Sequence, residues 1–285
     1  MRSDRPLSRY IIKRLAYAVL TLFALILLTF FMMRWLPGDP FIGEKTVSAT
    51  AMDNMRIKYG LDKPVIVQFF IYLGNCLRGD LGVSITYSRP VTEVISSAFL
   101  VSVDLGTRAL LFAVIAGVLL GAIAAVRRGT FADSFSMFIA MIGVSVPSFI
   151  MGALLQYFLA LQLRKVFGIT WFPIQGWGQL KHTFLPAFAL GLGSLATVSR
   201  LMRTSMLDVL SQDYIKTARA KGLSERRILW RHAMRNSIMP IVTIMGPTVA
   251  AVLTGTFIIE SIFNIPGLGK YFVTSIKDLD YTMIS

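Results

Sequence analysis

Long apolar stretches recur along this sequence and restrict the folds that are open to it. Most of them exceed the roughly 20 apolar residues that a helix needs to cross a bilayer. Inside a bilayer the backbone polar groups must be satisfied within the chain, which a helix does by itself. The sequence therefore predicts an all-α polytopic membrane protein with five spans, at residues 11–33, 100–126, 135–163, 184–199 and 237–263.

Composition supports a membrane protein and argues against a nucleic-acid-binding one. Only 15% of the residues are charged, whereas a soluble domain carries about 25%. The net charge of +14 could attract nucleic acid, but the basic residues gather at span ends and in one loop. That loop, residues 200–236 and hereafter the basic loop, holds nine Lys and Arg against three Asp and Glu. Such an excess indicates a cytoplasmic loop.

With the basic loop in the cytoplasm, the other segments between spans are assigned to alternate sides of the membrane. Residues 1–10 are basic and are predicted to be a cytoplasmic N-terminus, followed by an uncleaved first span at 11–35. Residues 36–98 contain six basic and six acidic residues, and alternation places them outside the cell with short helices between turns. A core of four spans follows at 99–263, and residues 264–285 form an extracytoplasmic turn.

Few residues could support catalysis or hold a cofactor. Cys76 is the single cysteine, and the two histidines, His182 and His232, are far apart in the sequence. No phosphate-binding loop sequence occurs. We expect a non-catalytic chain that binds no metal and no cofactor.

Polar and helix-breaking residues within the spans are candidates for a gate or a pathway. Asp104 and Arg108 are spaced i, i+4, which favours a mutually neutralising pair over a pathway-facing one. Pro147 is expected to kink the third span, through packing or as part of a gate. Glu260 lies near the outer end of the fifth span and is expected to reach the interface rather than to line a pathway. The small residues of Gly191–Ser194 permit close helix packing.

The basic loop is expected to contain two helices separated by a turn. Glycine disfavours a helix interior, so the first helix should end at Gly222. The second should run from Ser224, a plausible N-cap, to Arg235, with Leu229 and Ala233 on one apolar face and Arg226 and Arg227 displaced from it. Such a helix fits a groove of a soluble partner or a layer of anionic lipid headgroups, and the residues alone favour neither.

Five segments in order resemble those of one transporter family. The longest is YIKTARAKGLSERRILWRHAMRNSIMP at 214–240, and the others are LPGDP (36–40), YGLDKP (59–64), GDLG (79–82) and IFNIPGLG (262–269). Together they are similar to permeases of ATP-binding-cassette importers of the dipeptide, oligopeptide and nickel group, and they cover nearly the whole chain.

This resemblance implies a fold, a function and partners. The fold would be that of a type I importer, with a second homologous permease, two ATPase subunits that hold ATP and Mg²⁺, an extracytoplasmic substrate-binding protein, and a place in the cytoplasmic (inner) membrane. The chain would form half of a pathway for oligopeptides or dipeptides. Its basic loop would contact an ATPase cleft through Thr217, Ala218, Ala220, Gly222, Leu223, Ser224, Arg227 and Leu229.

The sequence departs from the family pattern in two places. The wider superfamily motif begins Glu-Ala-Ala, whereas this chain has Lys216, Thr217 and Ala218. Such permeases normally have six spans, and the sixth would begin about where this sequence stops. We interpret the sequence as a truncated form, an incomplete sequence or a natural fragment.

Alternative functions are weaker. Importers of nickel chelates or of glutathione belong to the same family. An ion-driven carrier should have acidic residues at mid-membrane, whereas Asp104 and Glu260 both lie near outer ends. A stand-alone channel or a membrane scaffold does not account for the ordered segments.

Overall fold

A computed structural model of the chain describes residues 7–35, 63–84, 86–278 and 280–284. Within these ranges every named secondary-structure element is a helix. The only β-type pairing there is an isolated bridge between Val83 and Pro90. Two of the family-like segments are affected by these limits: LPGDP (36–40) and most of YGLDKP (59–62) lie outside the described residues.

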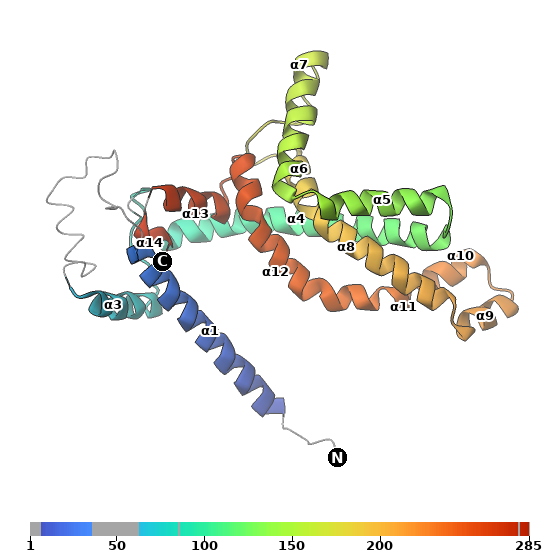
Figure 1. Ribbon diagram of the computed structural model, residues 1–285, viewed down its shortest axis with the longest axis horizontal. Coiled ribbons are helices and arrows are strands. Elements are labelled where there is room, and N and C mark those ends of the chain that lie inside the picture. Colours follow the sequence, from blue (N-terminus) through green and yellow to red (C-terminus); the bar gives the residue numbers. More distant parts are fainter. Residues whose placement is uncertain (1–6, 36–62, 85, 279, 285) are drawn as a thin grey trace. The chain divides into compact units, whose positions relative to one another are not determined.

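Five helices in the described part of the chain are long and apolar enough to cross a membrane, which confirms the expected number of spans. They are α1 (Leu7–Trp35), α4 (Val91–Val126), the continuous helix made by α6 (Ser148–Leu155), the π-helical η1 (Gln156–Gln162) and α7 (Leu163–Phe167), then α8 (Phe184–Leu210) and α12 (Met239–Ile262). Figure 1 shows their course along the chain.

The chain divides into two compact units. The first comprises residues 1–96 and 272–285. In it, α1 contacts α3 (Val65–Leu77) through aromatic rings, with Phe30 stacked on Tyr72 and edge-on to Phe69. Residues 79–82 form the turn that the sequence predicted, and both glycines there have positive φ.

A buried carboxylate holds the later part of the first unit together. Asp280 lies just before the short helix α14 (Tyr281–Ile284) and is fully buried. Its carboxylate accepts hydrogen bonds from the hydroxyl group of Ser84 and from the backbone N–H of Thr86.

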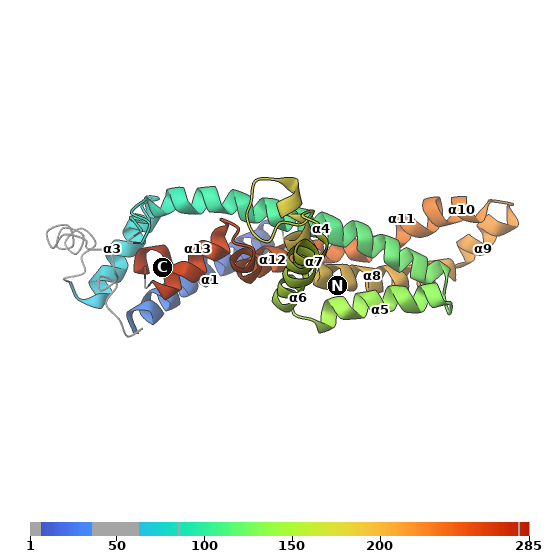
Figure 2. The ribbon, with the colours of Figure 1, turned by 90° about the horizontal axis from the view of Figure 1, so that it is seen from above.

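The second unit, residues 97–271, is built around α8. Figure 2 shows α8 between α4 and α5 (Phe131–Ser145). A Cβ atom on Gly191 would lie 2.7 Å from the carbonyl oxygen of Ala109 in α4. A Cβ atom on Gly143 of α5 would lie 2.5 Å from the carbonyl oxygen of Leu192. The backbones therefore approach closely on both sides of α8, and the role predicted for the small residues Gly191–Ser194 is confirmed.

The prediction of one kinked span at 135–163 is wrong. Helix α5 ends at Ser145, Val146 is extended with φ −99° and ψ 120°, and a separate helix begins at Ser148. Proline has no N–H to continue the ladder, and its ring disfavours the α conformation for the residue before it. Pro147 therefore separates two helices, and Figure 1 shows α6 and α7 turning away from α5.

Other boundaries differ from the predicted ones. Helix α4 begins at Val91, ahead of the predicted core boundary at 99. Helix α8 continues to Leu210, so the first part of the basic loop extends the fourth span. Residues 264–285, predicted as a turn, contain α13 (Leu268–Lys277) and α14.

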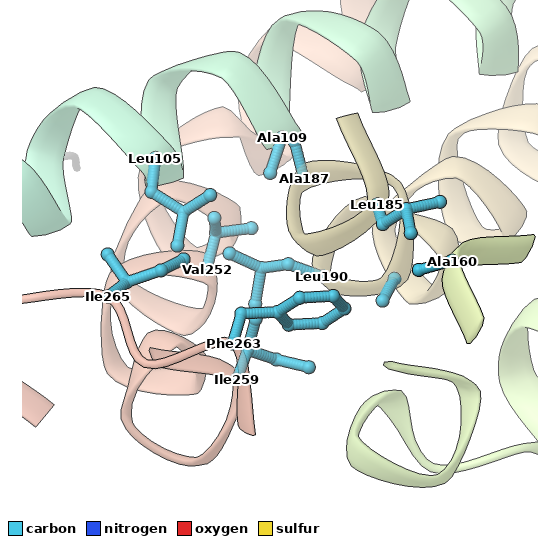
Figure 3. Packing of buried hydrophobic residues seen from close by; sticks show 11 residues of the cluster. Leu105, Ala109, Ala160, Leu185, Ala187, Leu190, Val252, Ile259, Phe263 and Ile265 are labelled. Carbon is cyan, nitrogen blue, oxygen red and sulfur yellow. The ribbon is translucent and has the colours of Figure 1, made fainter. Parts of the chain in front are cut away.

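Two apolar clusters lie in opposite halves of α4, α8 and α12. Figure 3 shows the first, in which side chains from these helices point toward Phe263 and Ile265 of the turn after α12. The second cluster lies next to the basic loop and includes Met202 and Met206 of α8. It also includes Ala233 of the basic loop itself, so the loop is packed against the core of the unit.

Candidate functional site

The later part of the basic loop folds as a helical hairpin. Its first arm is α9 (Asp213–Ala220), and its second comprises α10 (Glu225–Arg227), the π-helical η3 (Ile228–Ala233) and α11 (Met234–Ser237). We call residues 213–237 the basic hairpin. Gly222 lies between the arms with φ +74°, a conformation that favours glycine. The predicted end of the first helix at Gly222 is therefore confirmed.

Hydrogen bonds show why the chain reverses at this glycine. The N–H of Gly222 donates to the carbonyl of Arg219, and the N–H of Leu223 donates to the carbonyl of Ala218. This pair of bonds is the Schellman motif, in which glycine takes the left-handed position and an apolar contact follows it. Here Leu223 packs against Ala218 and completes that contact.

The hairpin has a small apolar core of its own. Ile215 and Ile228, one from each arm, are fully buried, and Ala218 is nearly so. Ala218 lies where the two arms meet, so a larger side chain would displace Ile228 or Leu223. The resemblance assigned a small residue to this position, and the packing gives the physical reason for it.

Two polar contacts join the arms at their ends. Arg219 donates to both carboxylate oxygens of Glu225, with Nε 2.7 Å from Oε1 and Nη2 3.2 Å from Oε2. The amide of Asn236 donates to the hydroxyl of Tyr214 at 3.0 Å. The Arg219 hydrogen bond lowers the pKa of Glu225, and the same bond raises the pKa of Arg219. Both side chains of the ion pair are about half exposed, so it adds little stability.

Sequence reasoning missed both contacts. The available signal for the ion pair was two opposite charges on either side of a predicted glycine turn.

The second arm attaches the hairpin to the rest of the unit. Leu229 and Ala233 both pack into the cluster that contains Met202 and Met206, so the predicted apolar face is confirmed. Ser224 occupies the N-cap position as predicted, with an extended backbone, but its side chain makes no capping hydrogen bond.

The opposite side of the second arm is exposed and cationic. Arg226, Arg227 and Arg231 are exposed, and with Ser224 and Trp230 they line a shallow hollow of about 490 Å³. Displacement of Arg226 and Arg227 from the apolar face is therefore confirmed. Of the other predicted contact residues, Thr217, Ala220 and Gly222 are also exposed, while Leu223 and Leu229 are half-buried.

An ion pair next to the hairpin joins α5 to α8. Arg203 forms two parallel hydrogen bonds with Asp133, with Nε 2.7 Å from Oδ1 and Nη2 2.8 Å from Oδ2. The hydrogen bond from Arg203 is the main cause that lowers the pKa of Asp133 to about 2. The N–H of Gly129 and the charge of Arg128 act in the same direction, and burial opposes them. The pair holds the short α4–α5 turn against α8, and sequence reasoning did not identify it.

The four predicted gate or pathway residues do not form one site. Asp104 and Arg108 pair with each other at 2.9 Å, as their spacing predicted, and Arg108 also donates to the hydroxyl of Thr183. Pro147 lies at the separate corner between α5 and α6. Among the residues that the structure describes, no group of three or more His, Cys, Asp or Glu side chains could hold a metal ion.

The expectation that Glu260 reaches the interface is wrong, because its side chain is fully buried. Its carboxylate accepts hydrogen bonds from the hydroxyl of Ser102 at 2.6 Å and from the N–H of Gly269 at 2.7 Å. The Ser102 oxygen in turn accepts the N–H of Leu268. Gly267 allows this arrangement, because a Cβ atom there would overlap the carboxylate. These N–H and O–H groups replace the water that a carboxylate otherwise requires.

Comparisons with known proteins match almost the whole chain. The family model described as "Binding-protein-dependent transport system inner membrane component" matches residues 117–285. A companion model for the N-terminal part of such membrane components matches residues 7–106.

Individual relatives are similar over nearly their full length. The chain is 42% identical to a dipeptide transport system permease protein of Lactococcus lactis subsp. cremoris, over 97% of this chain and 89% of the relative. It is 43% identical to the corresponding Bacillus subtilis protein, over 98% and 89%. It is 41% identical to an oligopeptide transport system permease protein of Escherichia coli, over 97% and 89%. With five described helices that are long and apolar enough to cross a membrane, this chain therefore belongs to the family of inner membrane components of binding-protein-dependent transport systems.

Proposed function

We propose that this chain is a permease subunit of an ATP-driven importer that takes up dipeptides or oligopeptides. The observation that carries this proposal is the similarity, over 97–98% of the chain, to permeases named for dipeptide and oligopeptide transport. The chain would form half of the translocation pathway and would not itself catalyse a reaction.

The basic hairpin is the proposed contact with an ATPase subunit. Its small core makes it a compact body rather than a flexible loop. The first arm and the turn expose Thr217, Ala220 and Gly222 to a partner. The second arm packs Leu229 and Ala233 into the second apolar cluster. A displacement of the hairpin would therefore be passed directly to α4 and α8, which share that cluster.

The proposed assembly contains this chain, a second homologous permease, two ATP-binding subunits and an extracytoplasmic substrate-binding protein. ATP and Mg²⁺ would be bound by the ATP-binding subunits. The proposed location is the cytoplasmic membrane with the N-terminus and the basic hairpin in the cytoplasm, since basic residues near span ends are retained on that side.

The first test is purification of the chain from native membranes in mild detergent, followed by mass spectrometry of the proteins that accompany it. We expect a second permease and ATP-binding subunits. Recovery of the chain alone, under conditions that preserve a known importer, would contradict the proposal. Reconstituted complexes would then be tested with labelled dipeptides, oligopeptides, nickel chelates and glutathione. Uptake of nickel chelates or glutathione without uptake of peptides would show that peptides are not the substrate.

The second test uses substitution of Gly222 by valine. A β-branched residue at φ +74° is strained by roughly 1–2 kcal/mol, so the reversal between the hairpin arms should distort. Peptide uptake should fall while ATP hydrolysis becomes less dependent on substrate.

Gly168→Val is the matched control. Gly168 has a similar φ of +68°, and a Cβ atom at either glycine would meet nothing within 4 Å. Gly168 ends α7, outside the basic loop. Equal loss of uptake in both variants would show a general folding defect, and unchanged coupling in Gly222→Val would remove the hairpin from the mechanism.

A further inference from the structure

An apolar hollow of about 460 Å³ lies between the hairpin and the ends of α4 and α8. This volume is within the range of pockets that bind small ligands. Its lining residues come from α4, α8, the start of α5 and the second arm of the hairpin, and Arg127 is the one charged residue among them. The hollow therefore offers hydrocarbon walls with a single cation at one side.

Trp230 connects this hollow to the cationic one. Its side chain lines the apolar hollow with Leu229 and Met234, and it also lines the hollow formed by Arg226, Arg227 and Arg231. The indole is 58% exposed. Tryptophan is enriched at the boundary between hydrocarbon and headgroups, where one part of the ring is apolar and the other is wet.

The positive charge around Trp230 is not compensated within the described part of the chain. The ion pairs of this unit join Asp104 to Arg108, Asp133 to Arg203, Asp213 to Lys216 and Glu225 to Arg219. None of them includes Arg127, Arg226, Arg227 or Arg231. Four guanidinium groups are thus available to an anion next to an apolar hollow.

We propose that these adjoining hollows bind one anionic phospholipid. An acyl chain occupies the apolar hollow, the phosphate pairs with the arginines, and the Trp230 indole lies at the boundary between them. Basic pockets at the cytoplasmic ends of membrane helices suit anionic headgroups. The inference uses the proposed function in one respect, which is that the hairpin faces the cytoplasmic leaflet.

A second apolar hollow in the same unit serves as an internal comparison. It has a volume of about 630 Å³ and is lined by Phe131, Phe135, Phe138, Met141 and other residues, with Arg200 as its one charged member. The hollow formed by Arg226, Arg227 and Arg231 shares none of its lining residues. Lipid tails should contact it without preference for an anionic headgroup.

The test uses photoactivatable phosphatidylglycerol with a diazirine in its acyl chain, and phosphatidylcholine with the same label. Each is added to the importer purified with its partner subunits, and crosslinked peptides of this chain are mapped. We expect phosphatidylglycerol to label residues 119–126 and 229–234 more strongly than phosphatidylcholine does. Removal of one cation by Arg127→Gln should lower that preference roughly fivefold, the ratio for one basic residue near an anionic surface.

Two variants separate lipid binding from a folding defect. Arg200→Gln removes the cation of the comparison hollow and should leave labelling of 119–126 and 229–234 unchanged. Ile123→Phe extends a wall of the apolar hollow and should lower labelling by both lipids.

Three results would overturn the proposal: equal labelling by the two lipids, labelling confined to 134–141, or no effect of Arg127→Gln. Recovery of ATP-binding subunits and peptide uptake are recorded on the same samples. If these fail while selective labelling persists, the proposed function is wrong and the lipid site stands.

Discussion

Glu260 and Asp280 are acidic side chains that are fully buried without a basic partner among the described residues. Each accepts a hydrogen bond from a serine hydroxyl and from a backbone N–H, which belongs to Gly269 at the start of α13 for Glu260 and to Thr86 for Asp280. A buried carboxylate is tolerated only when its oxygens are satisfied in this way. At the scale of single residues, Glu260 therefore connects the end of α12 to the start of α13, and Asp280 connects the residue before α14 to Ser84 and Thr86.

Substitution of Glu260 by glutamine tests this role. Glutamine has one accepting oxygen in place of two, so its NH2 group must face either the hydroxyl of Ser102 or the N–H of Gly269. A buried donor left unpaired costs about 1–3 kcal/mol, so the thermal unfolding temperature in detergent should fall by several degrees.

Glu93→Gln is the matched control for this prediction. Glu93 forms an ion pair with Arg89, and both side chains are more than half exposed. Exposed pairs contribute about 0–1 kcal/mol, so this change should have little effect. Equal shifts in the two variants would show that burial of Glu260 adds no stability.

Sequence spacing predicted the Asp104–Arg108 pair correctly but did not predict the burial of Glu260. Asp104 and Arg108 are neighbours on one helix, so their contact follows from i, i+4 geometry. The partners of Glu260 include Ser102, which is 158 positions away. A carboxylate near a span end is ordinarily hydrated. Only the tertiary fold brings together the O–H and N–H donors that replace water around Glu260.

At the scale of elements, close packing around α8 rests on a few glycines. Gly191 faces the backbone of α4, whereas a Cβ atom on Gly193 of the same helix would lie 3.6 Å from its nearest neighbour, the carbonyl oxygen of Gly143. Gly191→Ala should separate α4 from α8 and destabilise the protein by roughly 1–3 kcal/mol. Thermal unfolding in detergent measures the difference.

Gly193→Ala serves as the comparison within one helix. Its added methyl makes ordinary contact, and alanine favours a helix over glycine by about 1 kcal/mol. This variant should therefore be as stable as the native chain or more so. Equal destabilisation by both changes would mean that helix contact at Gly191 is not the cause.

Two helix breaks show how far local sequence determines an element. Gly222 has Leu223 after it and Ala218 before it, so the whole Schellman motif is local and the sequence predicted its position. Pro147 lies in an apolar run long enough for one span, and proline is compatible with either a kink or a full break. The extended conformation of Val146 decided between them, and packing of α5 and α6 against α8 accompanies it.

At the scale of the whole molecule, the proposed orientation can be tested with the single native cysteine. Cys76 lies in α3, is partly exposed, and belongs to the segment predicted to be outside. A membrane-impermeant maleimide should label it in intact cells. The variant Cys76→Ser with Ser211→Cys moves the thiol to an exposed position between α8 and α9, and labelling should then require permeabilised cells.

Cys76→Ser alone provides the background for both measurements, since it contains no thiol. The reverse pattern of labelling would invert the orientation of the chain. Labelling of both positions in intact cells would show that the basic hairpin is accessible from outside.

The sequence predicted the class of the fold better than its internal connections. Span number and the position of the basic hairpin depend on apolar length and on charge, which are local properties. The Asp133–Arg203 pair, and the hydrogen bonds that Asp280 accepts from Ser84 and Thr86, join residues 70 or more positions apart. No local pattern specifies such contacts.

The same long-range hydrogen bonds have a consequence for the order of folding during synthesis. Ser102 and Ser84 acquire their carboxylate partners only 158 and 196 residues later. At a synthesis rate of about 5–20 residues per second, that interval is on the order of ten seconds or longer. Ser84 and the early half of α4 are therefore synthesised well before these partners, and the final hydrogen-bonded arrangement forms only after residues 260–280 have been made.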